Sequence, residues 1–223
     1  MRPAATSDWT AHWAVDPDYT VRCRAAAHPA ATPAILVALA ADPNSEVRHW
    51  VAVHPSCPPE ALARLATDKD WRLCKAVAEH PNTSPGALAV LANHKNAQVR
   101  TAVAMNLTTP SHAVEKLAAD CEWWVRKAVA ERPSLSLSVL YKLVEDASDS
   151  VRMQAVAHHM VTPEMFTHLA SDRNWQVRTA IAEHRKTPPE VLATLVTDPD
   201  KNVRQAALAN PALPAHIQIL TQI

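Results

Sequence analysis

The stretch that decides the fold is "DRNWQVRTAIAEHRKTPPEVLATL", residues 172–195. Asn174 stands three residues before Val177, at the start of an apolar-periodic segment. Asparagine in that position is a typical helix N-cap. Thr187-Pro188 then begins a second apolar segment, and proline is favoured in the first turn of a helix because its missing amide would be unpaired there. The stretch therefore predicts two short helices joined by a turn.

The same pattern recurs along the chain with a period of 26 residues. Val-Arg occurs at 21–22, 47–48, 99–100, 125–126, 151–152, 177–178 and 203–204. The one step of 52 has Leu73-Cys74 at its middle. A fixed period of this size is the signature of a stacked repeat protein. We therefore predict a single repeat domain over residues 1–223, with units starting near 18, 44, 70, 96, 122, 148, 174 and 200, a partial helix over 6–15 and a terminal helix over 214–223.

Each unit carries the same start and stop signals. The expected N-cap residues of the first helix are Asp18, Asn44, Asp70, Asn96, Ser148, Asn174 and Asp200, while Glu122 departs from the pattern. The second helix is expected to begin at Thr32-Pro33, Thr162-Pro163 and Thr187-Pro188, and leucines three apart face one side of it. Helices of about ten residues are marginal alone in water. They must be held by neighbouring units, so the predicted fold class is an all-α solenoid.

The composition narrows the range of functions. Lys plus Arg equals Asp plus Glu at 22 each, which is poor support for a polyanion-binding surface. A single glycine excludes glycine-rich phosphate loops. No run approaches the 18 apolar residues of a membrane span. The four cysteines include no CxxC and are expected to be free thiols, which favours a soluble protein of a reducing cytoplasm.

An aspartate five residues before most Val positions indicates how the units connect. One unit lacks the aspartate, at His94, and one lacks the arginine, at Cys74. If each arginine pairs with the aspartate 20 residues later, Cys74 faces His94 and no interior charge is stranded, whereas an unpaired buried charge would cost about 3–5 kcal/mol. We therefore predict a structural ladder of six pairs: Arg22–Asp42, Arg48–Asp68, Arg100–Asp120, Arg126–Asp146, Arg152–Asp172 and Arg178–Asp198.

The repeat resembles the leucine-rich repeat variant family of bacteria, and its "D-x-x-x-x-V-R" element also resembles HEAT repeats. The resemblance covers essentially the whole chain. It implies a right-handed superhelix of paired short helices, with one helix per unit partly 3₁₀, and it implies a binding surface with no particular reaction or partner. Some family members carry an N-terminal iron–sulfur cluster held by clustered cysteines. Here Cys23 is the sole cysteine before Cys57, so we expect no cofactor.

A row of histidines, each seven residues after the Val/Leu position, admits two interpretations. Its members are His28, His54, His80, His158 and His184. A metal site would need two of them to converge, but neighbouring units are about 10 Å apart. The favoured interpretation is a polar residue near the C-terminus of a helix, where the macrodipole stabilises it. Asn106, Arg132 and Asn210 fill the same position, which fits that interpretation.

Aromatic residues follow the N-cap in every second unit: Tyr19, Trp71, Trp123 and Trp175. In one interpretation the rings pack over the edge of the neighbouring unit. In the other they form a stripe, about 20 Å apart, that anchors a protein partner or stacks bases. Trp124 and Trp50 would widen such a stripe. The candidate partner-binding residues are Tyr19, Trp71, Trp123, Trp124 and Trp175.

No catalytic motif stands out in the sequence, and we predict a non-enzymatic interaction module for a protein or peptide. Nucleic-acid binding is the alternative, by analogy with HEAT-like DNA glycosylases. A thiol or metal site at Cys74 and His94 is a third, weaker hypothesis, because a reactive thiol also needs an orienting group and a cleft. The apolar residues of the final segment "PAHIQILTQI" suggest self-association through the C-terminal helix.

Overall fold

The computed structural model describes residues 8–220, and these contain 17 helices and no strand. The first helix of each repeat, termed the B helix, has eight or nine residues: α2 (Tyr19–Ala27), α4 (Ser45–Ala52), α6 (Trp71–Glu79), α8 (Ala97–Met105), α10 (Trp123–Ala130), α12 (Asp149–Val156), α14 (Trp175–Glu183) and α16 (Lys201–Ala209). The intervening A helices are α1 (Asp8–Ala14), α3 (Pro33–Leu39), α5 (Pro59–Leu65), α7 (Pro85–Leu91), α9 (Ser111–Leu117), α11 (Leu137–Val144), α13 (Pro163–Leu169), α15 (Pro189–Leu195) and α17 (Ala215–Leu220).

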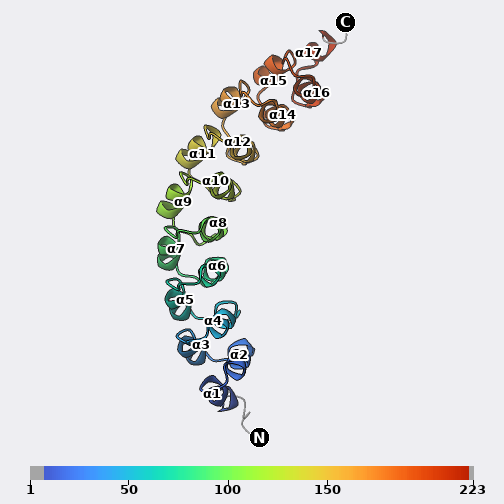
Figure 1. Cartoon of the computed structure of the whole chain (residues 1–223). Helices are drawn as coiled ribbons and strands as arrows, with labels where there is room; N and C mark the ends of the chain where they lie inside the picture. The colour runs from blue at the N-terminus through green and yellow to red at the C-terminus, as the bar shows by residue number, and fades with distance from the viewer. Residues whose placement is uncertain (1–7, 221–223) are drawn as a thin grey trace, which may run out of the picture. The chain divides into compact units, whose positions relative to one another are not determined.

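The helices form two compact units, Met1–Leu117 and Ala118–Ile223. Within each unit the B helices stand side by side in one row and the A helices form a second row behind them (Figure 1). Each B helix packs against the next B helix of its unit and against the A helices beside it. The fold class is therefore an α-solenoid of two-helix repeats, as predicted. The single domain over residues 1–223 remains a prediction.

The N-cap signals place the start of most B helices. Six of the expected cap side chains accept a hydrogen bond from the amide two residues on: Asp18, Asn44, Asp70, Asn96, Asn174 and Asp200. Ser148 does not, and the prediction of a side-chain cap there was wrong. The carboxylate of Asp149 accepts from the Ser150 amide instead. Glu122 also makes no side-chain cap bond.

The A helices begin where the prolines predict, with one shift. α3 and α13 start at Pro33 and Pro163, and the preceding threonine hydroxyl accepts an amide of the first turn. α15 starts at Pro189, one residue later than predicted. The reason is that the Thr187 hydroxyl donates to the carbonyl of Ile181, 2.6 Å away, and so holds the turn closed instead of capping the helix.

The expectation that one helix per unit is partly 3₁₀ was wrong for the described residues, all of whose helices are α-helices. Hydrogen bonds to the third preceding residue occur at the helix ends, for example from Asp42 N to Leu39 O at 3.0 Å. They tighten the last turn without forming a separate helix.

The core lies between the two rows of helices. The leucine pairs of the A helices are buried, as the spacing predicts, and so are the valines that precede the ladder arginines, except for the half-buried Val21. Phe166 and Met165 of α13 are the bulkiest additions in unit 2. Because the repeats of a unit bury their apolar sides against one another, the exposed side chains of the B helices are available to contact a partner.

The ends of the chain bear on two predictions. α1 falls within the partial helix predicted over 6–15, and α17 falls within the segment predicted over 214–223. Self-association was predicted from Ile217, Ile219, Leu220 and Ile223. Ile217 is half-buried, and the side chains of the other three lie outside the part of the chain that the structure describes. Self-association therefore stays a prediction.

Candidate functional site

The predicted ladder is present in both units. Five of the six expected arginines donate from Nε to the aspartate 20 residues later, at 2.6–2.7 Å. In each of these pairs Nη2 donates to the second carboxylate oxygen, so the contact is bidentate, for example at 2.8 Å between Arg152 and Asp172. The sixth pair, Arg100–Asp120, joins residues of different units and stays a prediction.

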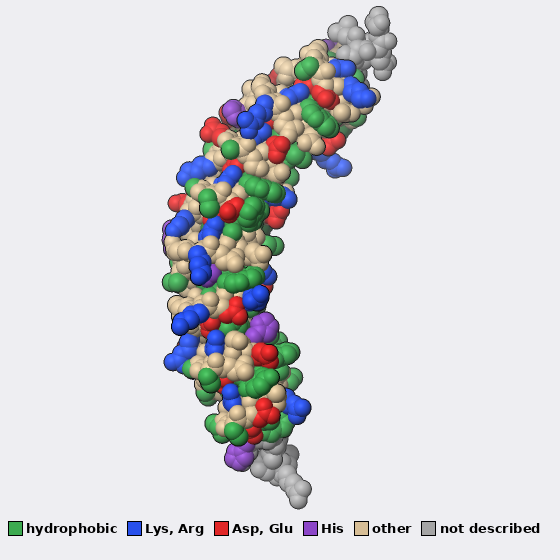
Figure 2. Space-filling view, in the orientation of Figure 1, with side chains coloured by type: hydrophobic (Ala, Val, Ile, Leu, Met, Phe, Trp, Pro, Cys, Tyr) green, Lys and Arg blue, Asp and Glu red, His purple; other side chains and the backbone are tan. Residues whose placement is uncertain are grey.

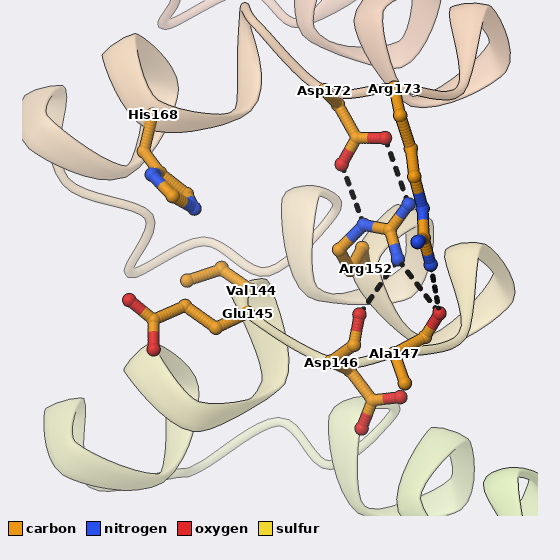
Figure 3. A pocket seen from close by; sticks show the side chains of 8 residues that line it. All are labelled: Val144, Glu145, Asp146, Ala147, Arg152, His168, Asp172 and Arg173. Atoms are coloured by element: carbon orange, nitrogen blue, oxygen red, sulfur yellow. Dashed lines mark hydrogen bonds and ion pairs between the residues drawn. The ribbon is translucent and has the colours of Figure 1, made fainter.

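Each ladder arginine also binds its own repeat. Arg152 Nη1 donates to the carbonyls of Asp146 and Ala147, at 2.7 and 3.2 Å, while Nε and Nη2 hold Asp172 (Figure 3). The Asp172 carboxylate in turn accepts from the Asn174 amide, just before α14. One guanidinium thus clamps the loop before its own B helix to the loop before the next one, and so fixes the spacing of consecutive B helices.

The electrostatics of the pairs follow from this geometry. The hydrogen bond from Arg178 lowers the pKa of Asp198, and burial offsets only part of that effect. The hydrogen bond to Asp146 raises the pKa of Arg126 above its usual value. The hydrogen bond to Asp198 likewise raises the pKa of Arg178, so both partners of the Arg178–Asp198 pair are charged at neutral pH. In each observed pair the guanidinium is already neutralised by its aspartate, so these arginines do not form a row of free cations for phosphate groups.

Cys74 and His94 each keep the local half of the missing pair. The Cys74 thiol donates to the carbonyl of Asp68 at 3.3 Å, where a ladder arginine would place Nη1. His94 Nδ1 accepts from the Asn96 amide at 3.0 Å, as a ladder carboxylate would. The described residues show no hydrogen bond between Cys74 and His94. Burial raises the pKa of the Cys74 thiol, which disfavours the reactive thiolate.

The histidine row forms a second ladder, which sequence reasoning missed. His54 Nε2 lies 3.1 Å from the carbonyl of His28, and His80 Nε2 lies 3.0 Å from that of His54, 26 residues earlier in each case. Asn106 continues the row by donating from Nδ2 to the carbonyl of His80 at 3.2 Å. In unit 2, His158 makes the equivalent contact with the carbonyl of Arg132, and Asn210 with that of His184. These side chains link repeats, instead of serving only the helix end as predicted.

The predicted aromatic residues lie on the exposed side of the B helices. Trp123, Trp124 and Trp175 of unit 2 are 44%, 41% and 42% exposed. Trp123 and Trp124 meet edge to face, with ring centroids 5.9 Å apart. In unit 1 Tyr19 and Trp50 are exposed to a similar degree, whereas Trp71 is half-buried and the Arg72 guanidinium lies 5.1 Å from its ring centroid. We call these six residues the aromatic face. Figure 2 shows hydrophobic side chains gathered over the B helices of both units.

A shallow groove of about 340 Å³ adjoins this face in unit 1. It lies between α4 and α6, and Trp50, His49 and Glu46 of α4 line it. Asp70, Arg72 and Leu73 form the opposite wall. The groove combines an exposed indole with charged groups of both signs, a mixture suited to a polypeptide segment.

A second hollow, of about 510 Å³, lies over the ladder in unit 2 (Figure 3). Its polar wall is the Arg152–Asp172 pair together with Arg173, whose Nη2 donates to the Ala147 carbonyl at 2.7 Å. His168 and Glu145 stand on the other side. Because both arginines are already engaged with protein groups, the hollow offers no uncommitted cation for an anionic ligand.

Comparisons with known proteins agree with the repeat. A family model described as "Leucine Rich Repeat Variant domain" matches residues 55–107, and one described as "Leucine rich repeat variant" matches residues 175–200. A solved structure described as a leucine-rich repeat variant with a novel repetitive structural motif superposes with a TM-score of 0.71 at 25% identity, covering 94% of this chain and 82% of that one. Residues 55–107 and 175–200 therefore match the leucine-rich repeat variant, and the fold of the chain is similar to that of a solved member.

Other solved structures resemble the chain more distantly. A structural-genomics target from E. coli gives a TM-score of 0.40 at 18% identity, covering 93% of this chain and 74% of that one. A designed armadillo repeat protein in complex with the peptide (KR)4 gives 0.37 at 18% identity, covering 89% and 95%. We base no functional argument on these two. No curated protein matches the chain. Among the described residues, no helix is long and apolar enough to span a membrane.

Proposed function

We propose that the chain is a non-enzymatic interaction module that binds a protein or peptide through the aromatic face. The observation that carries the proposal is the exposure of Trp123 and Trp124 on α10 and of Trp175 on α14, two B helices of unit 2 that have α12 between them. Tryptophan is among the residues most enriched at binding hot spots, because a large ring gains much contact area for little lost conformational freedom. Three such partly exposed rings, carried by two repeats, are well placed to anchor a partner.

The surroundings of the rings support a polypeptide partner. Acidic and basic side chains are interspersed on the face seen in Figure 2, as in ordinary protein interfaces with a mixed polar rim. The equal numbers of acidic and basic residues and the engagement of the ladder arginines weigh against nucleic acid. The groove beside Trp50 would let the same kind of partner contact unit 1.

We also propose that the protein functions in a reducing cytoplasm. Cys23, Cys57, Cys74 and Cys121 are all free thiols. Burial raises the pKa of Cys57 to about 11, so this thiol stays protonated and unreactive at neutral pH. The cysteines therefore serve as small packing or surface residues, and we assign the chain no catalytic group.

Replacing both Trp123 and Trp175 by alanine is expected to weaken partner binding by about 30-fold or more. The reason is that truncating a single hot-spot residue costs about 2 kcal/mol. The measurement is a quantitative pull-down with the wild type and the double variant as baits, followed by titration calorimetry with the recovered partner. Tyr141→Ala is the matched control, since this ring is 42% exposed but lies on the A helix α11.

Partner capture that survives in the double variant would count against the aromatic face. Nucleic-acid binding is tested separately with DNA and RNA at two salt concentrations. Salt-sensitive binding that the double variant loses would show that the rings stack bases and would replace the protein-partner proposal.

A further inference from the structure

The histidine ladder uses both nitrogens of each ring, and this fixes the protonation state. Nδ1 of His54 accepts the amide of Ser56, and Nδ1 of His80 accepts the amide of Asn82, both at 3.1 Å. A backbone amide only donates, so Nδ1 must carry the lone pair and the ring proton must be on Nε2. That proton points at the carbonyl of the preceding repeat, 3.0–3.1 Å away. The ladder therefore requires the neutral Nε2–H form of histidine.

The asparagines in the same row make this requirement plain. Asn106 accepts the Thr108 amide at Oδ1, 3.0 Å, and donates from Nδ2 to the preceding repeat. Asn210 does the same with the Ala212 amide at 2.9 Å and the carbonyl of His184. Asparagine thus offers the acceptor and donor of a neutral histidine in the same places, but it cannot gain a proton. Its Nδ2 also donates to a second carbonyl, that of Ala78 from Asn106 at 2.8 Å and that of Ala182 from Asn210 at 2.6 Å. The contact with the preceding repeat is thus kept by both residue types, but only histidine can respond to acid.

We propose that His54 and His80 form an acid-sensitive connection between repeats of unit 1, which joins consecutive repeats at neutral pH and releases them when the rings are protonated. Protonation turns Nδ1 into a donor that faces the donating amide of Ser56 or Asn82. One hydrogen bond is lost in each turn, and two donors are forced together. Both side chains are buried, at 4% and 6% exposure, so water cannot easily replace the lost partner.

The groups around the rings do not counteract this effect. His54 Nε2 contacts the backbone carbonyl of His28, and the carbonyl of His54 accepts from the Cys57 amide and lies 3.0 Å from His80 Nε2. Glu79, next to His80, pairs with Lys75. No described carboxylate forms an ion pair or hydrogen bond with either ring. An added proton on His54 or His80 would therefore have no counter-charge in direct contact.

In His158 of unit 2 the surroundings also disfavour the protonated ring. Burial lowers its pKa most, the stacked His159 ring lowers it further, and the contact with the Arg132 carbonyl opposes them. Its other charged neighbours are the cation of Lys186, which binds the His159 carbonyl, and Arg132 itself. Because the folded pKa is depressed, the unfolded chain binds the proton more readily. The stabilisation is present above the unfolded value of about 6.5 and is lost as the pH falls from that value through the lower folded pKa.

The test compares the wild type with His54→Asn/His80→Asn, which keeps the hydrogen bonds and removes the titration. Thermal unfolding is measured at pH 7.5 and pH 5.0. Four ladder aspartates stay ionised in this window because their pKa values are lowered: Asp42, Asp68, Asp172 and Asp198. The fall in Tm on acidification is expected to be at most half as large in the double variant as in the wild type. His49→Asn/His112→Asn, which changes two exposed histidines outside the row, should fall as far as the wild type.

An equal fall in Tm for the wild type and the His54→Asn/His80→Asn variant would overturn the proposal. A second measurement covers the case in which that variant does not fold. Nitrogen-15 spectra of the wild-type histidines at pH 7.5 are expected to show His54 and His80 as the neutral Nε2–H tautomer. A protonated ring or the Nδ1–H tautomer at that pH would equally exclude the connection described here.

Discussion

Arg152→Ala is expected to lower the free energy of unfolding by about 3–5 kcal/mol, the usual cost of removing one partner of a buried pair. The substitution strands the Asp172 carboxylate, whose side chain is 6% exposed, and removes the Arg152 donor from the carbonyl of Asp146. The Ala147 carbonyl loses one of its two arginine donors and keeps Arg173. Asp172→Ala should be similarly damaging, because it leaves the guanidinium buried without a counter-charge. The measurement is urea unfolding of each variant, followed by circular dichroism.

The double variant decides whether the two residues act as a pair. Arg152→Ala/Asp172→Ala should lose at least about 1–3 kcal/mol less than the sum of the single losses, since each single change already breaks the contact. Arg173→Ala is the matched control. This neighbouring arginine is exposed and binds one backbone carbonyl, so its loss should be within about 1 kcal/mol. Strictly additive losses for the pair would contradict the ladder.

Introducing an arginine–aspartate pair at positions 74 and 94 is expected to restore stability that the arginine alone would remove. Cys74→Arg alone is expected to cost several kcal/mol, about 3–5, because a guanidinium would replace a fully buried thiol and meet His94 instead of a carboxylate. His94→Asp alone should cost little, since aspartate can also accept the Asn96 amide. Cys74→Arg/His94→Asp should recover most of the first loss, because the two new side chains form the pair found in the other repeats.

The same urea titrations provide the check. The stability of the double variant is expected to lie above that of Cys74→Arg by about 3 kcal/mol. Asp68→Asn in the wild type is a useful reference, because it removes a working carboxylate from the adjacent rung formed with Arg48. If the double variant is no more stable than Cys74→Arg, residues 74 and 94 do not occupy the two positions of one ladder pair. Their coincident change would then not support the 20-residue pairing.

Much of the architecture could be predicted because one period controls it. The coincident losses at Cys74 and His94 were enough to choose the 20-residue pairing, since stranding a buried charge is costly. The starts of individual elements were harder. Ser148 fails to cap α12 because Asp149 competes for the first-turn amides, and Thr187 prefers the Ile181 carbonyl to the start of α15. Such local competition between hydrogen bonds is not visible in the repeat pattern.

The role of the histidines could have been inferred from one signal. Asn106 and Asn210 alternate with histidine in the row, and asparagine shares with neutral histidine one acceptor and one donor at matching distances. A helix-dipole explanation accounts for histidine and arginine but not for asparagine. The aromatic residues are different, because burial alone cannot separate packing from binding when a ring is about half covered. The sequence therefore predicted where the rings lie but not what they contact.

The measurement that tests the proposed function most directly is site-specific photo-crosslinking in cells. A photoreactive phenylalanine analogue is placed at Trp123 or Trp175 on the B helices, and at Tyr141 on the A helix α11 as the matched site. We predict protein crosslinks from positions 123 and 175 and none from position 141. Crosslinks from position 141 alone, or crosslinks from 123 and 175 to nucleic acid instead of protein, would contradict the account.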